Sequence, residues 1–202
     1  MSEADTELVR FSPAERWVHR SVAVLAGVCV ATAAVLYLEP LATLVGNRPV
    51  VTFLHVWSGV ALVLPILAGL ASRAYRADLG RLNRMTTHDR LWLTDRAVRA
   101  RNREVGKFNA GQKLNTTLSA AAVAVLLGTG AIMAWTWLAP VQYRTGATFV
   151  HDLTALAFVL LVAGHVWHAQ NDPEARYGMR TGRVSPGWAR RHHPAWADDP
   201  EA

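Results

Sequence analysis

Two histidines stand fourteen residues apart in the apolar stretch FVHDLTALAFVLLVAGHVWHA of this 202-residue chain. On a helix, His151 and His165 would lie about 40° apart around the axis and about 21 Å apart along it. One helix can therefore present an imidazole near each surface of a membrane, with both rings facing the same bundle interior. If other helices supply partner imidazoles, this spacing is suited to holding two stacked haems.

Four long apolar runs would position these histidines. Each has a core of about twenty residues, enough to cross a hydrocarbon layer about 30 Å thick as a helix. Charges within the runs are few. Arg20 and Lys113 lie at the ends of their runs, and Asp152 lies near the start of the fourth run. The sequence therefore predicts an all-α integral membrane four-helix bundle. The helices are expected at residues 17–38, 50–72, 112–138 and 145–170.

The net charge of +6 is concentrated beside the apolar runs. The loop 73–111 and the tail 171–202 carry most of the arginines, whereas the loops 39–49 and 139–144 hold only Arg48 and Arg144. By the positive-inside rule, both termini and the long loop are expected on the cytoplasmic side, with residues 17–170 forming the membrane domain. This placement disfavours nucleic-acid binding. Residues 1–16 are polar and acidic, so we expect no cleavable signal peptide and insertion directed by the first helix.

The predicted topology assigns the histidines to two depths. His19 begins the first helix and His165 ends the fourth, so both are expected near the cytoplasm. His55 and His151 begin helices that start outside. The economical pairing is His19 with His165 at an inner site and His55 with His151 at an outer site. His168 lies about 100° out of line with His151 and is better placed beside the inner site.

Two neutral imidazoles can coordinate the iron of a b-type haem from both sides, and such a centre carries one electron at a time. Gly59, one turn beyond His55, and Gly164, before His165, suit the approach of a flat macrocycle, although close helix packing explains such glycines equally well. Cys29 is the only cysteine, so any haem is non-covalent. Histidines that form interhelical hydrogen bonds or relay protons remain the alternative.

Two segments of the long loop have further patterns. THDRLWLTDRAVRA suits either a short amphipathic helix capped by Thr87 or a solvated basic segment near lipid headgroups. In GKFNAGQK, residues 106–113, Asn109 and Gln112 offer amide groups and Gly111 allows close approach of a flat ligand. With His165 and His168 these groups can bind quinone carbonyls. Helix capping by Asn109 is the other interpretation.

Three separated motifs carry a family resemblance. GKFNAGQK, RTGATFVHD and GRVSPGWARRHHPAW, with WVHR at the first helix, resemble the cytochrome b (gamma) subunit of membrane-bound formate dehydrogenases, over residues 10–196. More broadly the chain is similar to di-haem four-helix membrane cytochromes b. The resemblance implies a subunit with two b haems that passes electrons from an iron–sulfur subunit to menaquinone or another quinone. Formate oxidation would then belong to a molybdenum or tungsten partner chain.

The resemblance also implies site residues. The haem ligands carry over onto His19, His55, His151 and His165, and the quinone contacts onto Asn109, Gly111 and His165, with Gln112 adjacent. His168 departs from the family, which often has an aromatic hydroxyl at that position.

Several alternatives stay open. The tail histidines His192 and His193 have three possible roles: an iron–sulfur subunit contact, a second metal site, which adjacent residues on one helix disfavour, or an ordered cap. For the whole chain, the alternatives are a cytochrome b of a hydrogenase or thiosulfate reductase, a haem-free transporter, and a membrane anchor.

Overall fold

The computed structural model describes residues 7–101 and 103–199. The chain divides into two compact units. Unit 1 contains residues 1–16, 72–120 and 161–202, and unit 2 contains residues 17–71 and 121–160. Helices dominate, and two strands of two residues each form the sheet seen in the described part of the chain.

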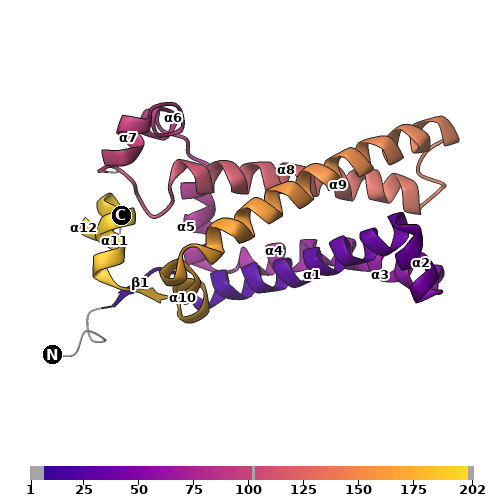
Figure 1. The fold of residues 1–202 in the computed structure, drawn as a ribbon, viewed down its shortest axis with the longest axis horizontal. Helices are drawn as coiled ribbons and strands as arrows, with labels where there is room; N and C mark the ends of the chain where they lie inside the picture. Colours follow the sequence, from indigo (N-terminus) through magenta and orange to yellow (C-terminus); the bar gives the residue numbers. More distant parts are fainter. Residues whose placement is uncertain (1–6, 102, 200–202) are drawn as a thin grey trace. The chain divides into compact units, whose positions relative to one another are not determined.

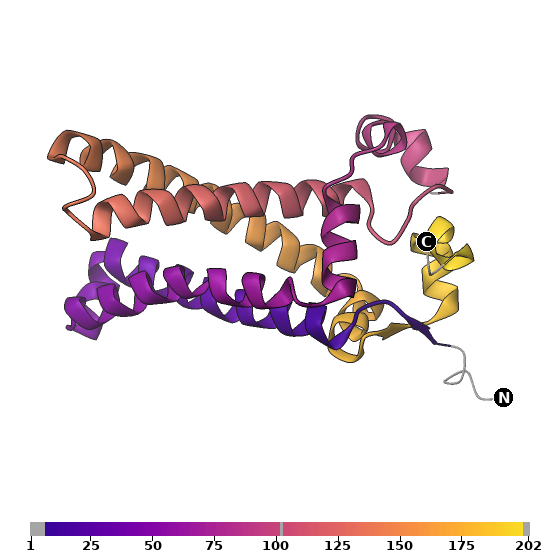
Figure 2. The ribbon, with the colours of Figure 1, turned by 180° about the vertical axis from the view of Figure 1, so that it is seen from behind.

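The four apolar runs form helices, as predicted. The helices that could cross a membrane are α1 (Pro13–Tyr37), α3 with α4 (Arg48–Ala61 and Val63–Gly69), α8 (Ala110–Ala134) and α9 (Val141–Gln170). The short helix α2 (Glu39–Val45) connects α1 to α3, and a turn connects α8 to α9 (Figure 1, Figure 2). Unit 2 therefore takes most of its residues from two helical hairpins.

The outer surfaces of these helices show that lipid must complete the fold. In the most apolar 18-residue window of each span, only 6% to 17% of the residues are buried. Large apolar side chains such as Leu64, Phe149 and Leu160 are more than 60% exposed. Apolar surface of this extent is costly in water and favourable in a hydrocarbon layer. The chain is therefore a membrane protein.

The second span is interrupted where the sequence predicted one continuous helix. Pro65 has no backbone N–H, so it cannot donate the usual hydrogen bond one turn back. Just before it, the Leu62 N–H donates to the Gly59 carbonyl at 3.1 Å, a tighter i to i−3 bond. Leu62 keeps right-handed helical angles (φ −55°, ψ −29°), so the chain continues as a helix past the irregular turn.

In unit 1, the basic loop forms three helices, α5 (Arg73–Leu82), α6 (Thr87–Thr94) and α7 (Arg96–Arg101). The helical interpretation of THDRLWLTDRAVRA is therefore correct. The predicted cap is wrong by one residue, because Thr86 is the N-cap. Its hydroxyl accepts from the Asp89 N–H at 3.1 Å, and Asp89 accepts from the Thr86 N–H at 2.8 Å. This reciprocal capping box selects the first of the two adjacent threonines.

The two ends of the chain form a terminal cap within unit 1. Strand β1 (Leu8–Val9) pairs antiparallel with β2 (Arg183–Val184), which lies between α10 (Pro173–Thr181) and α11 (Pro186–His192), with α12 (Pro194–Asp198) following. The prolines 173, 186 and 194 each occupy a first helical position, where no N–H is needed. A tryptophan core of Val184, Trp188, Ala189 and Trp196 closes this cap.

Gly182 joins the two ends. Its carbonyl accepts hydrogen bonds from the N–H groups of Arg10 and Phe11, at 2.8 and 3.1 Å. Its φ is +91°, and a Cβ there would lie 2.5 Å from the Phe11 carbonyl oxygen. Only glycine fits this position without displacing the backbone.

Candidate haem and quinone sites

Unit 2 brings together two of the predicted ligands. The rings of His55 on α3 and His151 on α9 have centroids 6.2 Å apart and planes 68° apart. Both side chains are half-buried. His55 and His151 therefore form a spatial pair of imidazoles, and their place at the outer side of a membrane stays a prediction.

Each of these rings is held through its Nδ1 atom. His55 Nδ1 lies 3.2 Å from the Cys29 carbonyl and 3.0 Å from Thr32 Oγ1. His151 Nδ1 lies 2.9 Å from Thr129 Oγ1. A metal-binding histidine ordinarily donates one ring N–H to such a group and presents the other nitrogen to the metal. The printed contacts of both rings therefore use Nδ1, and Nε2 is the nitrogen that could bind a metal.

The ring separation fits an iron atom between the imidazoles. A coordinating imidazole nitrogen lies about 2 Å from a metal, and the ring centre lies roughly 1 Å further, so two opposed rings have centroids about 6 Å apart. The 6.2 Å separation of His55 and His151 matches this requirement. A porphyrin itself supplies four nitrogens to iron, so two side chains complete the coordination. Across the described residues, no group of three or more metal-binding side chains occurs.

A cavity in unit 2 lies against the same pair. Its volume is about 100 Å³, and its lining is apolar apart from the two histidines and includes Cys29, Gly59 and Phe158. Gly59, selected from the sequence, therefore lines the space beside His55 and His151. Pockets for drug-sized ligands have volumes of about 300 to 1,000 Å³, so a macrocycle requires the lining side chains to move apart.

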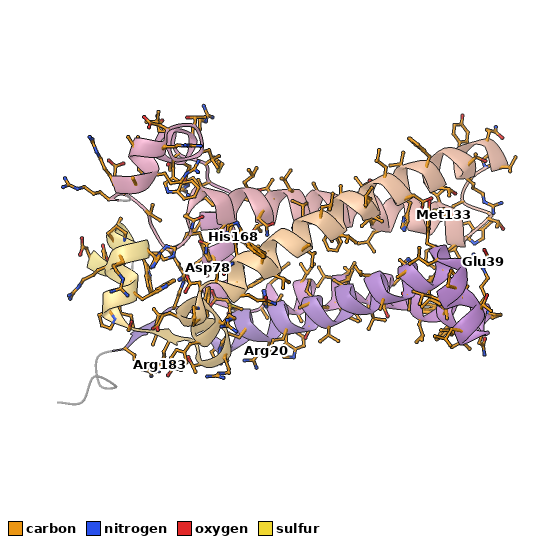
Figure 3. The ribbon with its side chains drawn as sticks, viewed as in Figure 1. Arg20, Glu39, Asp78, Met133, His168 and Arg183 are labelled. Atoms are coloured by element: carbon orange, nitrogen blue, oxygen red, sulfur yellow. The ribbon has the colours of Figure 1, made fainter. Side chains whose placement is uncertain are left out.

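The other predicted residues are distributed over both units. His19, two turns into α1, belongs to unit 2, whereas His165 and His168, near the end of α9, belong to unit 1 (Figure 3 labels His168). All three side chains are exposed in the isolated chain. The pairing of His19 with His165 stays a prediction. Gly164 has open space where a Cβ would be.

Asn109 and Gln112 form a capping box at the start of α8. Asn109 Oδ1 accepts from the Gln112 N–H at 2.9 Å, and Gln112 Oε1 accepts from the Asn109 N–H at 3.0 Å. The capping interpretation of Asn109 is therefore correct. These bonds use the side-chain oxygens of Asn109 and Gln112. A ligand carbonyl would instead need a donor, and the side-chain NH₂ groups of the same two residues are donors.

The indole of Trp92 packs against Gly111. A Cβ on Gly111 would lie 3.5 Å from Trp92 Cζ3 and 3.3 Å from Asn109 Oδ1. Among the described residues, Trp92 Nε1 is buried and has no hydrogen-bond partner. A buried donor without a partner is unusual in folded proteins and often marks a ligand site. The glycine thus admits a flat aromatic group, and a donor is available on the same indole.

Two lysines tie the GKFNAGQK segment to the rest of unit 1. Lys107 Nζ lies 3.1 Å from Glu15 and also bonds Asp78, and Lys113 Nζ lies 2.7 Å from Asp89. Burial raises the pKa of Asp78 to about 6, reinforced by its hydrogen bond with Glu15 and opposed by Lys107. Figure 3 labels Asp78, which belongs to this network. The ion pairs fix the start of α8, which carries the predicted quinone contacts.

His193 has the role of a structural core residue. It is 2% exposed, its Nδ1–H donates to the Gly106 carbonyl at 2.8 Å, and its Nε2 accepts from Arg10 at 3.0 Å. Burial and the Arg10 charge lower the pKa of His193 to about 3. Burial also lowers the pKa of Arg10 to about 10. Of the three predicted roles for the tail histidines, the ordered cap fits His193.

Sequence reasoning missed Thr32, Thr129 and Trp92. Threonine is common in membrane helices, where its hydroxyl bonds a carbonyl four residues earlier, so composition gives no signal for the first two. Thr32 precedes His55 by 23 residues, and Thr129 precedes His151 by 22. This similar spacing is one signal that each threonine faces its histidine across a helical hairpin. Trp92 lies in the segment THDRLWLTDRAVRA, where the amphipathic pattern identifies it only as an apolar residue.

Four apolar spans and a close pair of imidazoles define a membrane protein suited to non-covalent haem. A family model described as prokaryotic cytochrome b561 matches residues 10–169. The chain belongs to the prokaryotic cytochrome b561 family. Membership implies haem b and electron transfer.

Two curated relatives are similar to this chain. Over 96 residues it is 32% identical to the cytochrome b556(Fdn) subunit of nitrate-inducible formate dehydrogenase from Escherichia coli (strain K12). That alignment covers 46% of this chain and 44% of the relative. The cytochrome b556(fdo) subunit of formate dehydrogenase from the same organism is 25% identical over 206 residues, covering 97% of the chain and 94% of the relative.

Proposed function

We propose that this chain is the di-haem b membrane subunit of a formate dehydrogenase complex. It passes electrons across the bacterial inner membrane to menaquinone or another quinone. His55 and His151 hold the outer haem, and His19 and His165 hold the inner haem. Both termini and the loop 73–111 lie in the cytoplasm.

The outer pair is the observation that carries this proposal. Two imidazoles with centroids 6.2 Å apart, each tethered through Nδ1, are spaced as opposed ligands of one iron. When bound, the haem supplies a one-electron carrier with no open coordination position. The chain itself holds the ligand rings through Nδ1 and lines the space beside them with apolar side chains.

Asn109, Gly111 and Gln112, together with His165 and His168, form the proposed quinone site. The orphaned Trp92 N–H and the flat contact at Gly111 support this location. Reduction of a quinone to the quinol consumes two electrons and two protons. In the proposed topology these protons come from the cytoplasm, so turnover stores membrane potential.

Partner chains complete the proposed complex. The relatives named as formate dehydrogenase subunits support a complex with other chains. In the proposal these are an iron–sulfur subunit that delivers electrons at the outer face, and a molybdenum or tungsten subunit that oxidises formate. A cytochrome b subunit of a hydrogenase or thiosulfate reductase would use the same four histidines with another donor. The transporter and the anchor do not account for the opposed pair.

Quinol-driven haem reduction tests the direction of the relay. The purified chain in detergent is mixed with a reduced menaquinone analogue, and haem absorbance is followed in the wild type, His151→Ala and His165→Ala. The proposal predicts that His151→Ala keeps an inner haem that the quinol reduces quickly. His165→Ala keeps only the outer haem, which the quinol reduces slowly.

His192→Ala, in the terminal cap, serves as the matched histidine control and reacts like the wild type. Equal reduction rates in His151→Ala and His165→Ala contradict the assignment of the inner haem to the quinone side.

A further inference from the structure

Thr32 and His55 form a defined hydrogen-bonded unit across the first hairpin of unit 2. The Thr32 hydroxyl donates to the Val28 carbonyl at 2.6 Å, so its oxygen is left to accept. His55 Nδ1 lies 3.0 Å from that oxygen and 3.2 Å from the Cys29 carbonyl. A carbonyl can only accept, so Nδ1 must carry the proton, and Nε2 is left with its lone pair.

Thr129 and His151 repeat this arrangement in the second hairpin. The Thr129 hydroxyl donates to the Val125 carbonyl at 2.7 Å, and His151 Nδ1 lies 2.9 Å from Thr129 Oγ1. In both hairpins the threonine comes from the first long helix and the histidine from the helix that follows. The two ligands of one proposed iron are therefore oriented by the same device from opposite sides.

A hydrogen bond at Nδ1 affects more than the ring's orientation. It selects the tautomer in which Nε2 binds the metal. It also makes Nε2 a stronger electron donor. The acceptor draws the Nδ1 proton partly away from the ring, and the electron density left on the ring raises the basicity of Nε2. A more basic ligand stabilises ferric iron over ferrous iron, which lowers the reduction potential.

We propose that Thr32 and Thr129 are positioning residues that fix the Nδ1–H tautomer of His55 and His151 and lower the reduction potential of the outer haem. The inference rests on the proposed haem ligation by these histidines. Its effect falls on the outer haem, because Thr32 contacts His55 and Thr129 contacts His151.

The test is a spectroscopic redox titration of the purified chain. Thr32→Val and Thr129→Val remove the hydroxyl and keep the shape, whereas Thr32→Ser and Thr129→Ser keep the hydroxyl. We expect Thr129→Val to shift the ferric–ferrous equilibrium of one haem about tenfold toward ferrous, a rise of about 59 mV for one electron. Thr32→Val should shift the same haem in the same direction by less, because the Cys29 carbonyl still accepts from His55 Nδ1. The other haem should keep its potential, and each serine variant should restore the wild-type value.

Thr148→Val is the matched control. Thr148 makes the same kind of bond to a carbonyl four residues earlier, at 3.0 Å, on an exposed part of α9. Nitrogen-15 NMR of histidine-labelled, haem-free protein provides a second readout, with Nδ1–H expected in the wild type.

Unchanged potentials in both valine variants, or valine and serine variants that behave alike, overturn this inference and leave the ligation intact. A wild-type chain that binds no outer haem overturns the proposed function instead.

Discussion

Acidification from pH 7 to pH 5 should loosen the terminal cap by protonating His193. The ring is 2% exposed between Arg10, the Gly106 carbonyl and the tryptophan core, with Trp188 at a centroid distance of 5.1 Å. Protonation would put a second positive charge in this buried site beside Arg10, and the Gly106 carbonyl offsets only part of that cost. The pKa of His193 is accordingly lowered from 6.5 to about 3.

The sign follows from proton binding. Between pH 6.5 and 3 the unfolded cap binds a proton at this position and the folded cap does not, so the free energy of opening falls as the pH falls. At pH 5 the difference between 6.5 and the solution pH is 1.5 units. At about 1.4 kcal/mol per unit this removes about 2 kcal/mol, or roughly a thirtyfold increase in the open population.

Hydrogen exchange of the full-length protein in detergent measures this effect. Protection of the amides in residues 189–197, corrected for the intrinsic pH dependence of exchange, reports the opening free energy. His193→Gln should abolish most of the pH dependence, while His192→Gln, at an exposed neighbour, should retain it. Protection that is equal at pH 7 and pH 5 in the wild type would refute the reasoning.

Two further substitutions test other parts of the account. Lys107→Met removes the cation that Glu15 and Asp78 share, while Asp78 keeps its ion pair with Arg81, and should cost about 3 kcal/mol in thermal unfolding. Adding Asp78→Asn should recover part of that loss, and additive costs would count against the network. Gly130→Leu should displace the His151 ring, because a Cβ there would lie 3.3 Å from Cε1. Haem content should fall by one, whereas Gly128→Leu, where an added Cβ meets nothing within 4 Å, should keep both haems.

The spans and the pairing of His55 with His151 were predictable because both follow from patterns along the chain. Twenty consecutive apolar residues predict a membrane-spanning helix, and the arginine distribution predicts that His55 and His151 share one depth. The break beside Pro65 was visible in the sequence as a proline within an apolar run. The length of the apolar run predicts one continuous span and gives no signal for the break at this proline.

The contacts of unit 1 could not be predicted, because they join residues distant in sequence. Arg10 meets His193 across 183 positions, and Lys107 meets Glu15 across 92. No local pattern specifies such partners. The capping box of Asn109 and Gln112 is local, and its spacing of three residues made the correct capping interpretation available.

The haem content of the purified, membrane-inserted chain tests the central claim most directly. A pyridine haemochrome spectrum is expected to give two haems b per polypeptide in the wild type. It should give one in each of His55→Ala, His151→Ala, His19→Ala and His165→Ala. A folded wild-type chain without haem, or a His55→Ala variant that keeps both haems, would contradict the two-depth relay.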